Sequence, residues 1–250
     1  MPTPFTHLAL TQRLLHDHDL PHAYRDLLLT YRSAFQLGSI VADARVSSGV
    51  GRHVTHFYSY DRPIIEHPWR VMLNDHPSLT TPHDDRHFVF LAGYVAHLAT
   101  DESWALKMVR PKFFIPEWEG VSRRDKFIAL HLILVHMDER DEAHIDDWQP
   151  DSLAQSMPDK WLPFLSDDIL CSWRDLISEQ IASTGISQTL AILGKRLSLD
   201  PAFLRHILDN PDIMRDRLWQ HVPKTLLNTV EKQMYTFTRD QLCHYLTEFS

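Results

Sequence analysis

The sequence predicts an all-α protein, and three observations lead to that prediction. Apolar residues recur at helical spacing along most of the 250 residues. Prolines and side chains that cap helices stand where such apolar stretches begin. No segment alternates apolar and polar residues over the length expected of a long strand. Several helices of moderate length joined by short connections favour a helical bundle.

Four stretches in the first 150 residues carry the clearest helical signals. Pro21 suits the first turn of the second helix, and Gly38 is its expected stop. Pro82 opens the next strong helix, which Pro111 should end. Ser122 is the expected N-cap of the last one. The predicted helices span residues 6–17, 21–37, 83–109 and 122–142, with a short helix beginning within 54–60 and loops over 39–51 and 113–120.

The stretch over residues 148–163 is broken by three prolines and is the best candidate for a boundary. We expect residues 1–148 to form the helical core and residues 149–250 to add helices that pack on the same domain. These further helices are predicted over residues 167–184, 187–197, 201–208 and 223–248.

Composition and charge argue against several classes of protein. Hydrophobic residues at 44% and charged residues at 23% are ordinary for a globular chain. A formal net charge of −8 opposes phosphate neutralisation, so no nucleic-acid partner is indicated. Two cysteines fit a reducing compartment. Because the N-terminus lacks a secretory signal and the longest apolar run, residues 88–99, is too short for a membrane span, we predict a cytoplasmic protein without a transmembrane segment. The oligomeric state is left open.

Histidines are numerous and concentrated in the first part of the chain, with 14 of the 17 at or before residue 144. His97 and Asp101 are four residues apart in an apolar helix, so they share a face. An ionised carboxylate there costs several kcal/mol unless it is paired or bound to a cation. A zinc-type site meets that demand, and so does a buried His–Asp hydrogen bond. The other pair at this spacing, His22 and Asp26, has polar neighbours and is expected to be a solvated ion pair.

Three further residues are candidate metal ligands, each with a simpler alternative. His7 lies just inside the first predicted helix, where surface and capping histidines are common. Asp43 follows an apolar run, although a lone acid in a loop is usually a cap or turn former. His56 lies between apolar neighbours and is otherwise a histidine of the core.

Together these segments resemble the zinc-dependent phospholipase C family. The resemblance covers about residues 5–110 and rests on four segments in the family's order: Thr-His-Leu at 6–8, Gly-Ser-Ile-Val-Ala-Asp at 38–43, Thr-His-Phe at 55–57, and Phe-Leu-Ala-Gly-Tyr-Val-Ala-His-Leu-Ala-Thr-Asp at 90–101, with Trp104 beyond. It implies an all-helical fold with a central cluster of metal ions, similar to the fold of the fungal single-strand-specific zinc nucleases. By this resemblance residues 1–148 are a metal-binding core in which one zinc is surrounded by Asp43, His56, His97 and Asp101. His7 would reach Asp101 and support a second ion, and Asp43 is also the candidate general base.

The chain departs from the family's pattern in two places. Secreted members use a processed N-terminal residue as a ligand, whereas His7 follows six other residues. They also carry a His-x-x-x-Glu pair after the central His-x-x-x-Asp, and here the only such pair is His244–Glu248. His136 with Glu139 is a candidate substitute. We therefore expect one or two ions, zinc or another divalent metal.

The expected activity is metal-dependent hydrolysis of a phosphoric diester, either a small molecule or a phospholipid head group. Zinc lowers the pKa of bound water to about 7, so that hydroxide attacks phosphorus at neutral pH while Asp43 orients the water or takes its proton. Two alternatives stay open. The adjacent His83 and Asp84 would suit a His-Asp phosphohydrolase, although the helix dipole also explains an acid at a helix start. A closed shell of four ligands would instead indicate a non-catalytic metal-binding protein.

Overall fold

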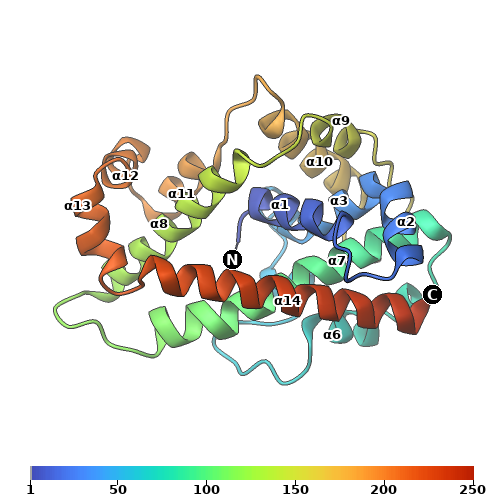
Figure 1. Ribbon diagram of the computed structural model, residues 1–250, viewed down its shortest axis with the longest axis horizontal. Helices are drawn as coiled ribbons and strands as arrows, with labels where there is room; N and C mark the ends of the chain where they lie inside the picture. The colour runs from blue at the N-terminus through green and yellow to red at the C-terminus, as the bar shows by residue number, and fades with distance from the viewer. Residues whose placement is uncertain (1) are drawn as a thin grey trace.

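Helices form every regular element of residues 2–250, the part of the chain that the computed structural model describes (Figure 1). The all-α prediction is therefore confirmed. The α-helices are α1 (Pro4–Leu15), α2 (His22–Thr30), α3 (Arg32–Val41), α4 (Arg45–Ser48), α5 (Arg52–His56), α6 (Pro68–Asp75), α7 (Asp85–Trp104), α8 (Arg123–Glu142), α9 (Gln149–Ala154), α10 (Asp167–Ile181), α11 (Thr189–Leu197), α12 (Pro201–Leu208), α13 (Pro211–Met214) and α14 (Lys224–Phe249). Tighter 3-10 segments are η1 (Ala42–Ala44) and η2 (Pro77–Thr80), and wider π-helical segments are η3 (Ala105–Phe114) and η4 (Arg215–Trp219).

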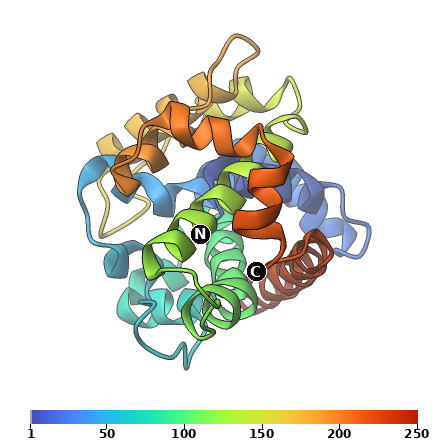
Figure 2. The same cartoon turned by 90° about the vertical axis from the view of Figure 1, so that its left-hand side faces the viewer.

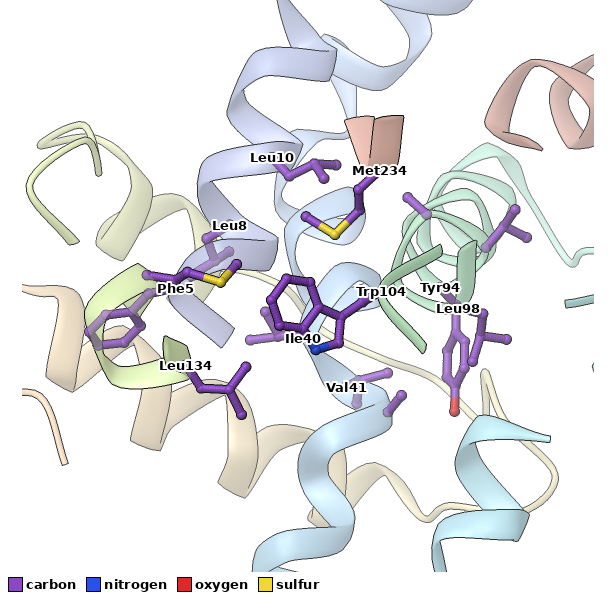
Figure 3. Packing of buried hydrophobic residues seen from close by; sticks show 14 of the residues in the cluster. Phe5, Leu8, Leu10, Ile40, Val41, Tyr94, Leu98, Trp104, Leu134 and Met234 are labelled. Carbon is purple, nitrogen blue, oxygen red and sulfur yellow. The ribbon is translucent and has the colours of Figure 1, made fainter. Parts of the chain in front are cut away.

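Helix α7 is the centre of the fold, and its residues from His87 to Trp104 are all buried. Figures 1 and 2 show α14 running beside it. The hydroxyl groups of Thr100 and Thr238 lie 2.9 Å apart and link the two helices. Side chains from α1, α3, α7, α8 and α14 meet around Trp104 (Figure 3). The apolar core therefore includes residues from both ends of the chain, while the division at residue 148 stays a prediction.

Helices α3 and α7 approach each other closely at a pair of glycines. A Cβ atom on Gly38 would lie 2.0 Å from the carbonyl oxygen of Phe90, and one on Gly93 would lie 2.2 Å from that of Phe35. The prediction that Gly38 ends its helix is wrong, because this residue lies inside α3. Its missing side chain serves the helix crossing, which brings the C-terminal end of α3 against the middle of α7.

Two other predicted breaks are also wrong. Most of the predicted loop over residues 39–51 is helical, because its apolar residues from Ile40 to Ala44 pack in the core. The helix ends only at Gly49, which adopts a left-handed conformation with φ of 74°. Pro111 does not stop the following helix either. The chain continues through it with a π-type hydrogen bond from the Ile115 amide to the Arg110 carbonyl (2.9 Å), a wider turn that accommodates the proline ring.

Several boundaries agree with the predictions. Ser122 caps α8, since its hydroxyl accepts a hydrogen bond from the Asp125 amide at 3.0 Å. Helix α12 has the predicted bounds, and α14 differs from its predicted range by one residue at each end. The short helices α6 and α13 were not predicted. Among residues 2–250, no helix is both long and apolar enough for a membrane crossing.

A buried carboxyl group on α8, Asp138, joins three segments of the chain. The Thr3 hydroxyl donates to one of its oxygens, and the Ser187 hydroxyl lies 3.4 Å from the other. Burial raises the pKa of Asp138 to about 7, although the hydroxyl contacts act in the opposite direction. In the folded protein the protonated form is therefore favoured below about pH 7.

We expect Asp138→Asn to stabilise the protein at pH values above about 7 and to have little effect near pH 4. Between the unfolded pKa, about 3.9, and the folded pKa of about 7, the folded state holds a proton that the unfolded chain has released. Stability due to this group therefore falls as the pH rises through that interval and is constant above it. Urea unfolding of the wild type and of Asp138→Asn, at several pH values across this interval, measures the difference in their free energies of unfolding. A difference that does not change with pH would contradict the expectation.

Candidate metal centre

Four elements bring the five predicted ligands together. Helix α7 supplies His97 and Asp101 one turn apart, α1 supplies His7, η1 supplies Asp43, and α5 supplies His56. All five residues are at most 5% exposed. Residues up to 94 positions apart in the sequence therefore share one buried site.

Three donor atoms form a compact triangle at its centre. Asp101 Oδ2 lies 3.4 Å from His56 Nε2 and 3.7 Å from His97 Nε2. The two histidine nitrogens are 3.5 Å apart. In a tetrahedral zinc site with bonds of about 2.0–2.1 Å, neighbouring donor atoms are separated by about 3.3 Å. The triangle therefore has close to the dimensions of one face of such a site, and Asp43 Oδ1, 3.5 Å from His56 Nε2, extends it.

His7 approaches the cluster from the other side of the Asp101 carboxylate. Its Nε2 atom lies 3.6 Å from Asp101 Oδ1, and its ring stacks on that of His97 with centroids 3.9 Å apart. Two overlapping sets of donors, one of His7, His97 and Asp101 and one of Asp43, His56 and His97, each fit within 4.8 Å. Asp101 therefore directs one oxygen toward His7 and the other toward His56 and His97.

Neighbouring groups fix the orientation of the two central imidazoles. The Nδ1–H of His97 donates to the Ser39 carbonyl at 2.8 Å, which leaves the Nε2 lone pair directed at the cluster. His56 Nδ1 lies 2.8 Å from the Thr55 hydroxyl. The Tyr94 hydroxyl donates to the Thr55 carbonyl at 2.8 Å and ties α5 to α7. Contacts of this kind orient metal-binding histidines in proteins.

The charge states of the site suit a cation. Burial and the Arg52 charge lower the pKa of His56 to about 4, and burial and His7 lower that of His97 to about 3. Burial opposes ionisation of Asp43, but its hydrogen bond with His56 and the nearby imidazoles lower its pKa to about 2. At neutral pH the site therefore combines neutral imidazoles with an ionised carboxylate, which are the protonation states that metal binding requires.

Two buried atoms of the site have no hydrogen-bond partner among the described residues: His7 Nε2 and Asp101 Oδ1. Unpaired buried polar atoms are rare because each costs about 1–3 kcal/mol. A cation between His7 and Asp101 would satisfy both atoms. The donor set, its spacing and these unpaired atoms all fit a zinc-type ion.

Arg52, at the start of α5, was not predicted to belong to the site. Its Nη2 atom lies 3.4 Å from Asp101 Oδ2 and donates to the Tyr58 hydroxyl at 2.6 Å. Its position four residues before His56 on one helix is the signal that the sequence offered. The predicted short helix began only within residues 54–60 and so left Arg52 out.

A surface cleft of about 520 Å³ lies between η3 and the first half of α8. Phe114, which is 48% exposed, lines it and packs edge-on against Tyr60, with ring centroids 5.7 Å apart. Tyr60 in turn contacts Arg52. The lining is mostly apolar, with charged residues among it: Phe113, Phe114, Ile115, Phe127 and Leu130 with Glu117, Arg123 and Lys126.

The other candidate groups lie outside this centre. Asp84 accepts a hydrogen bond from the His87 amide and is the N-cap of α7, and His83 beside it is exposed. This arrangement does not support a His-Asp phosphohydrolase dyad, because it is His97 that faces the cluster. His136 packs against Trp219 and Glu139 pairs with Arg205, so neither joins the donor sets found among residues 2–250. His22 and Asp26 form the expected solvated pair, 76% and 56% exposed.

An all-α fold around a buried cluster of His and Asp side chains defines a class of protein, the helical proteins with a central metal-type site. Residues 6–104 match the family described as zinc dependent phospholipase C. This match covers less than half of the 250 residues and agrees with the resemblance drawn from the sequence. The match ends at the last residue of α7, so η3 and the C-terminal helices lie outside it. No curated protein and no solved structure matches the chain.

Proposed function

We propose that the protein is a zinc-dependent phosphodiester hydrolase whose centre is formed by Asp43, His56, His97 and Asp101, with His7 supporting a second ion. The observation that carries the proposal is the triangle of three donor atoms separated by 3.4 to 3.7 Å in a fully buried site. The match of residues 6–104 to the zinc-dependent phospholipase C family supports the choice of metal and of reaction class.

The position of each residue indicates its role in the proposed reaction. When bound, zinc supplies a hydroxide nucleophile at neutral pH and a positive charge that neutralises the phosphoryl oxygens. His56, His97 and Asp101 are fully buried and would hold the ion. Asp43 is the most exposed of the five, at 5%, and is ionised. It is therefore the group best placed to orient the attacking water and to accept its proton.

The matching family suggests a lipid-type substrate, and a cleft that side-chain contacts link to the centre supports the same choice. Contacts run from Asp101 through Arg52 and Tyr60 to Phe114, which lines the cleft. Apolar walls would bind the acyl part of a phospholipid, and Arg123 and Lys126 at the cleft carry charges complementary to anionic head groups. We propose a phospholipid or a related amphiphilic phosphodiester as the substrate class.

We expect Asp43→Asn to lower kcat for hydrolysis of a chromogenic phosphodiester by about 100-fold or more, the usual contribution of a positioned general base. The zinc-loaded wild type should hydrolyse the diester, and the variant should keep at least most of its zinc because three ligands of the centre remain. Activity assays and elemental analysis of the same samples measure the two effects. Asp75→Asn, at an exposed acid on α6, is the matched control and should be as active as the wild type.

A zinc-loaded wild type that hydrolyses neither a soluble diester nor phospholipid vesicles would reject the proposal. That result would favour a closed, non-catalytic metal shell. Equal activity of Asp43→Asn and the wild type would leave the proposed hydrolase activity in place but would exclude Asp43 as its general base.

A further inference from the structure

Arg52 is an unusual neighbour for a cation site, since its guanidinium group stands beside the ligands with 16% of its side chain exposed. Tyr58 and Tyr60 hold it in place, because the guanidinium carbon lies 4.7 and 4.8 Å from their ring centroids. Both of its close polar contacts, to Asp101 Oδ2 and the Tyr58 hydroxyl, use the Nη2 atom. Its buried Nε atom has no hydrogen-bond partner among the described residues. Part of the donor fork is therefore available to a ligand.

The charge of a second arginine, Arg45, interacts favourably with Asp43 and Asp101 and unfavourably with Arg52. Arg45 begins α4, two residues after Asp43. Its Nε atom is also buried without a hydrogen-bond partner in the part of the chain that is described. Arg45 and Arg52 are the first residues of α4 and α5, the two helices that follow Asp43 and lead to His56. Each arginine is therefore close in the sequence to a candidate ligand, Arg45 to Asp43 and Arg52 to His56.

The charges around the cluster indicate a role for these two arginines. Arg52 Nη2 lies 3.4 Å from Asp101 Oδ2, whereas no ion pair joins Arg45 to an acid among residues 2–250. A divalent cation held by Asp101 would compete with Arg52 for that carboxylate, so that neither arginine would have a close counter-ion. A buried guanidinium group without a counter-ion is costly, so an anion would be bound strongly there. Arginine presents planar pairs of donors that match the oxygens of a phosphoryl group.

We propose that Arg45 and Arg52 form an anion-binding site at the edge of the cluster that holds the non-bridging oxygens of a phosphoryl group. The inference rests on the proposed function in that this phosphoryl group would belong to the substrate. It goes further by assigning recognition of the anion to two arginines, and by predicting that cation and anion binding reinforce each other. A second consequence is a preference for phosphate compounds over uncharged esters.

Inorganic phosphate is the probe, because its binding requires no turnover. We expect calorimetric titration of the zinc-loaded protein to give an affinity that falls by about 10- to 100-fold in Arg52→Gln, the range for a lost charge-assisted hydrogen bond. Arg45→Gln should lower it by about tenfold. Arg52→Lys keeps the charge but not the donor fork and should lie between wild type and Arg52→Gln. The control is Arg86→Gln, an exposed arginine about 22 Å along α7 from Asp101, which should bind phosphate as the wild type does.

Circular dichroism and the zinc content of each variant separate loss of the fold or of the metal from loss of anion binding. If Arg52→Gln does not fold, the comparison of Arg45→Gln and Arg52→Lys with the wild type decides the matter. Unchanged phosphate affinity in folded, zinc-loaded Arg45→Gln and Arg52→Lys would overturn the inference, even if the protein hydrolyses diesters. Arginine-dependent phosphate binding in a protein without hydrolase activity would support it while the proposed function fails.

Discussion

Replacing Asp101 by Asn is expected to weaken zinc binding by more than about 100-fold and to abolish hydrolysis of a phosphodiester. Residues that merely orient a ligand account for about 10- to 100-fold of metal affinity, so the loss of a direct ligand should exceed that range. Asp101 is also the one residue whose two oxygens face both halves of the cluster, His7 on one side and His56 with His97 on the other. The amide has nearly the same shape but lacks the charge that balances a cation.

Zinc per chain, measured after dialysis against a weak chelator, is the readout for Asp101→Asn. The matched control is Asp26→Asn, because Asp26 also follows a histidine by four residues but is 56% exposed. We expect the control to bind as much zinc as the wild type. Full zinc content and full activity in Asp101→Asn would mean that the cluster is not the metal centre.

Gly93→Ala is expected to destabilise the protein by about 2 kcal/mol or more, although alanine is the better helix former by about 1 kcal/mol. The added Cβ would lie 2.2 Å from the carbonyl oxygen of Phe35, an overlap that only a separation of α3 from α7 relieves. Overpacking of this kind typically costs about 1–3 kcal/mol and can cost more when backbone must move. The steric term therefore exceeds the gain in helix propensity.

The same substitution should also weaken the metal centre. Ser39, one residue after Gly38 on α3, accepts the hydrogen bond that orients His97. A shift of α3 would lengthen that bond, with an expected loss of about tenfold or more in zinc affinity. Urea unfolding and zinc titration measure the two effects. Gly194→Ala on α11 is the control, since its Cβ would meet nothing closer than 3.1 Å, and it should change stability little. Equal stability of Gly93→Ala and Gly194→Ala would contradict the account of the crossing.

Helical periodicity predicted most of the fold because the long helices bury continuous apolar faces. Helix α12 was predicted with its observed bounds, where Asp200 caps the helix and Pro201 follows in its first turn. Gly38 shows where local signals fail. The same residue suits a helix end or a close crossing, and only its distant partner Gly93 decides between them. Likewise, the Ser-Ser-Gly-Val-Gly cluster at 47–51 indicated a loop from Ser39 onward, but the apolar residues after Ser39 are buried in the core and helical.

The ligand candidates were accessible from the sequence because an ionisable pair in an apolar helix requires a partner, and the family resemblance supplied the other three. Their geometry was not accessible. The contact of Arg52 with Asp101 joins residues 49 positions apart, and no local pattern encodes it. The orientation of His97 by the Ser39 carbonyl depends on the crossing of α3 and α7, which was not predicted from the sequence.

Anomalous diffraction at the zinc edge, from crystals of zinc-loaded protein, tests the central claim most directly. We predict a strong peak within bonding distance of His56 Nε2, His97 Nε2 and an oxygen of Asp101, with or without a second peak between His7 and Asp101. A zinc-loaded crystal with its only peaks elsewhere, or a protein that takes up no zinc at all, would contradict the claim that these buried side chains share a cation.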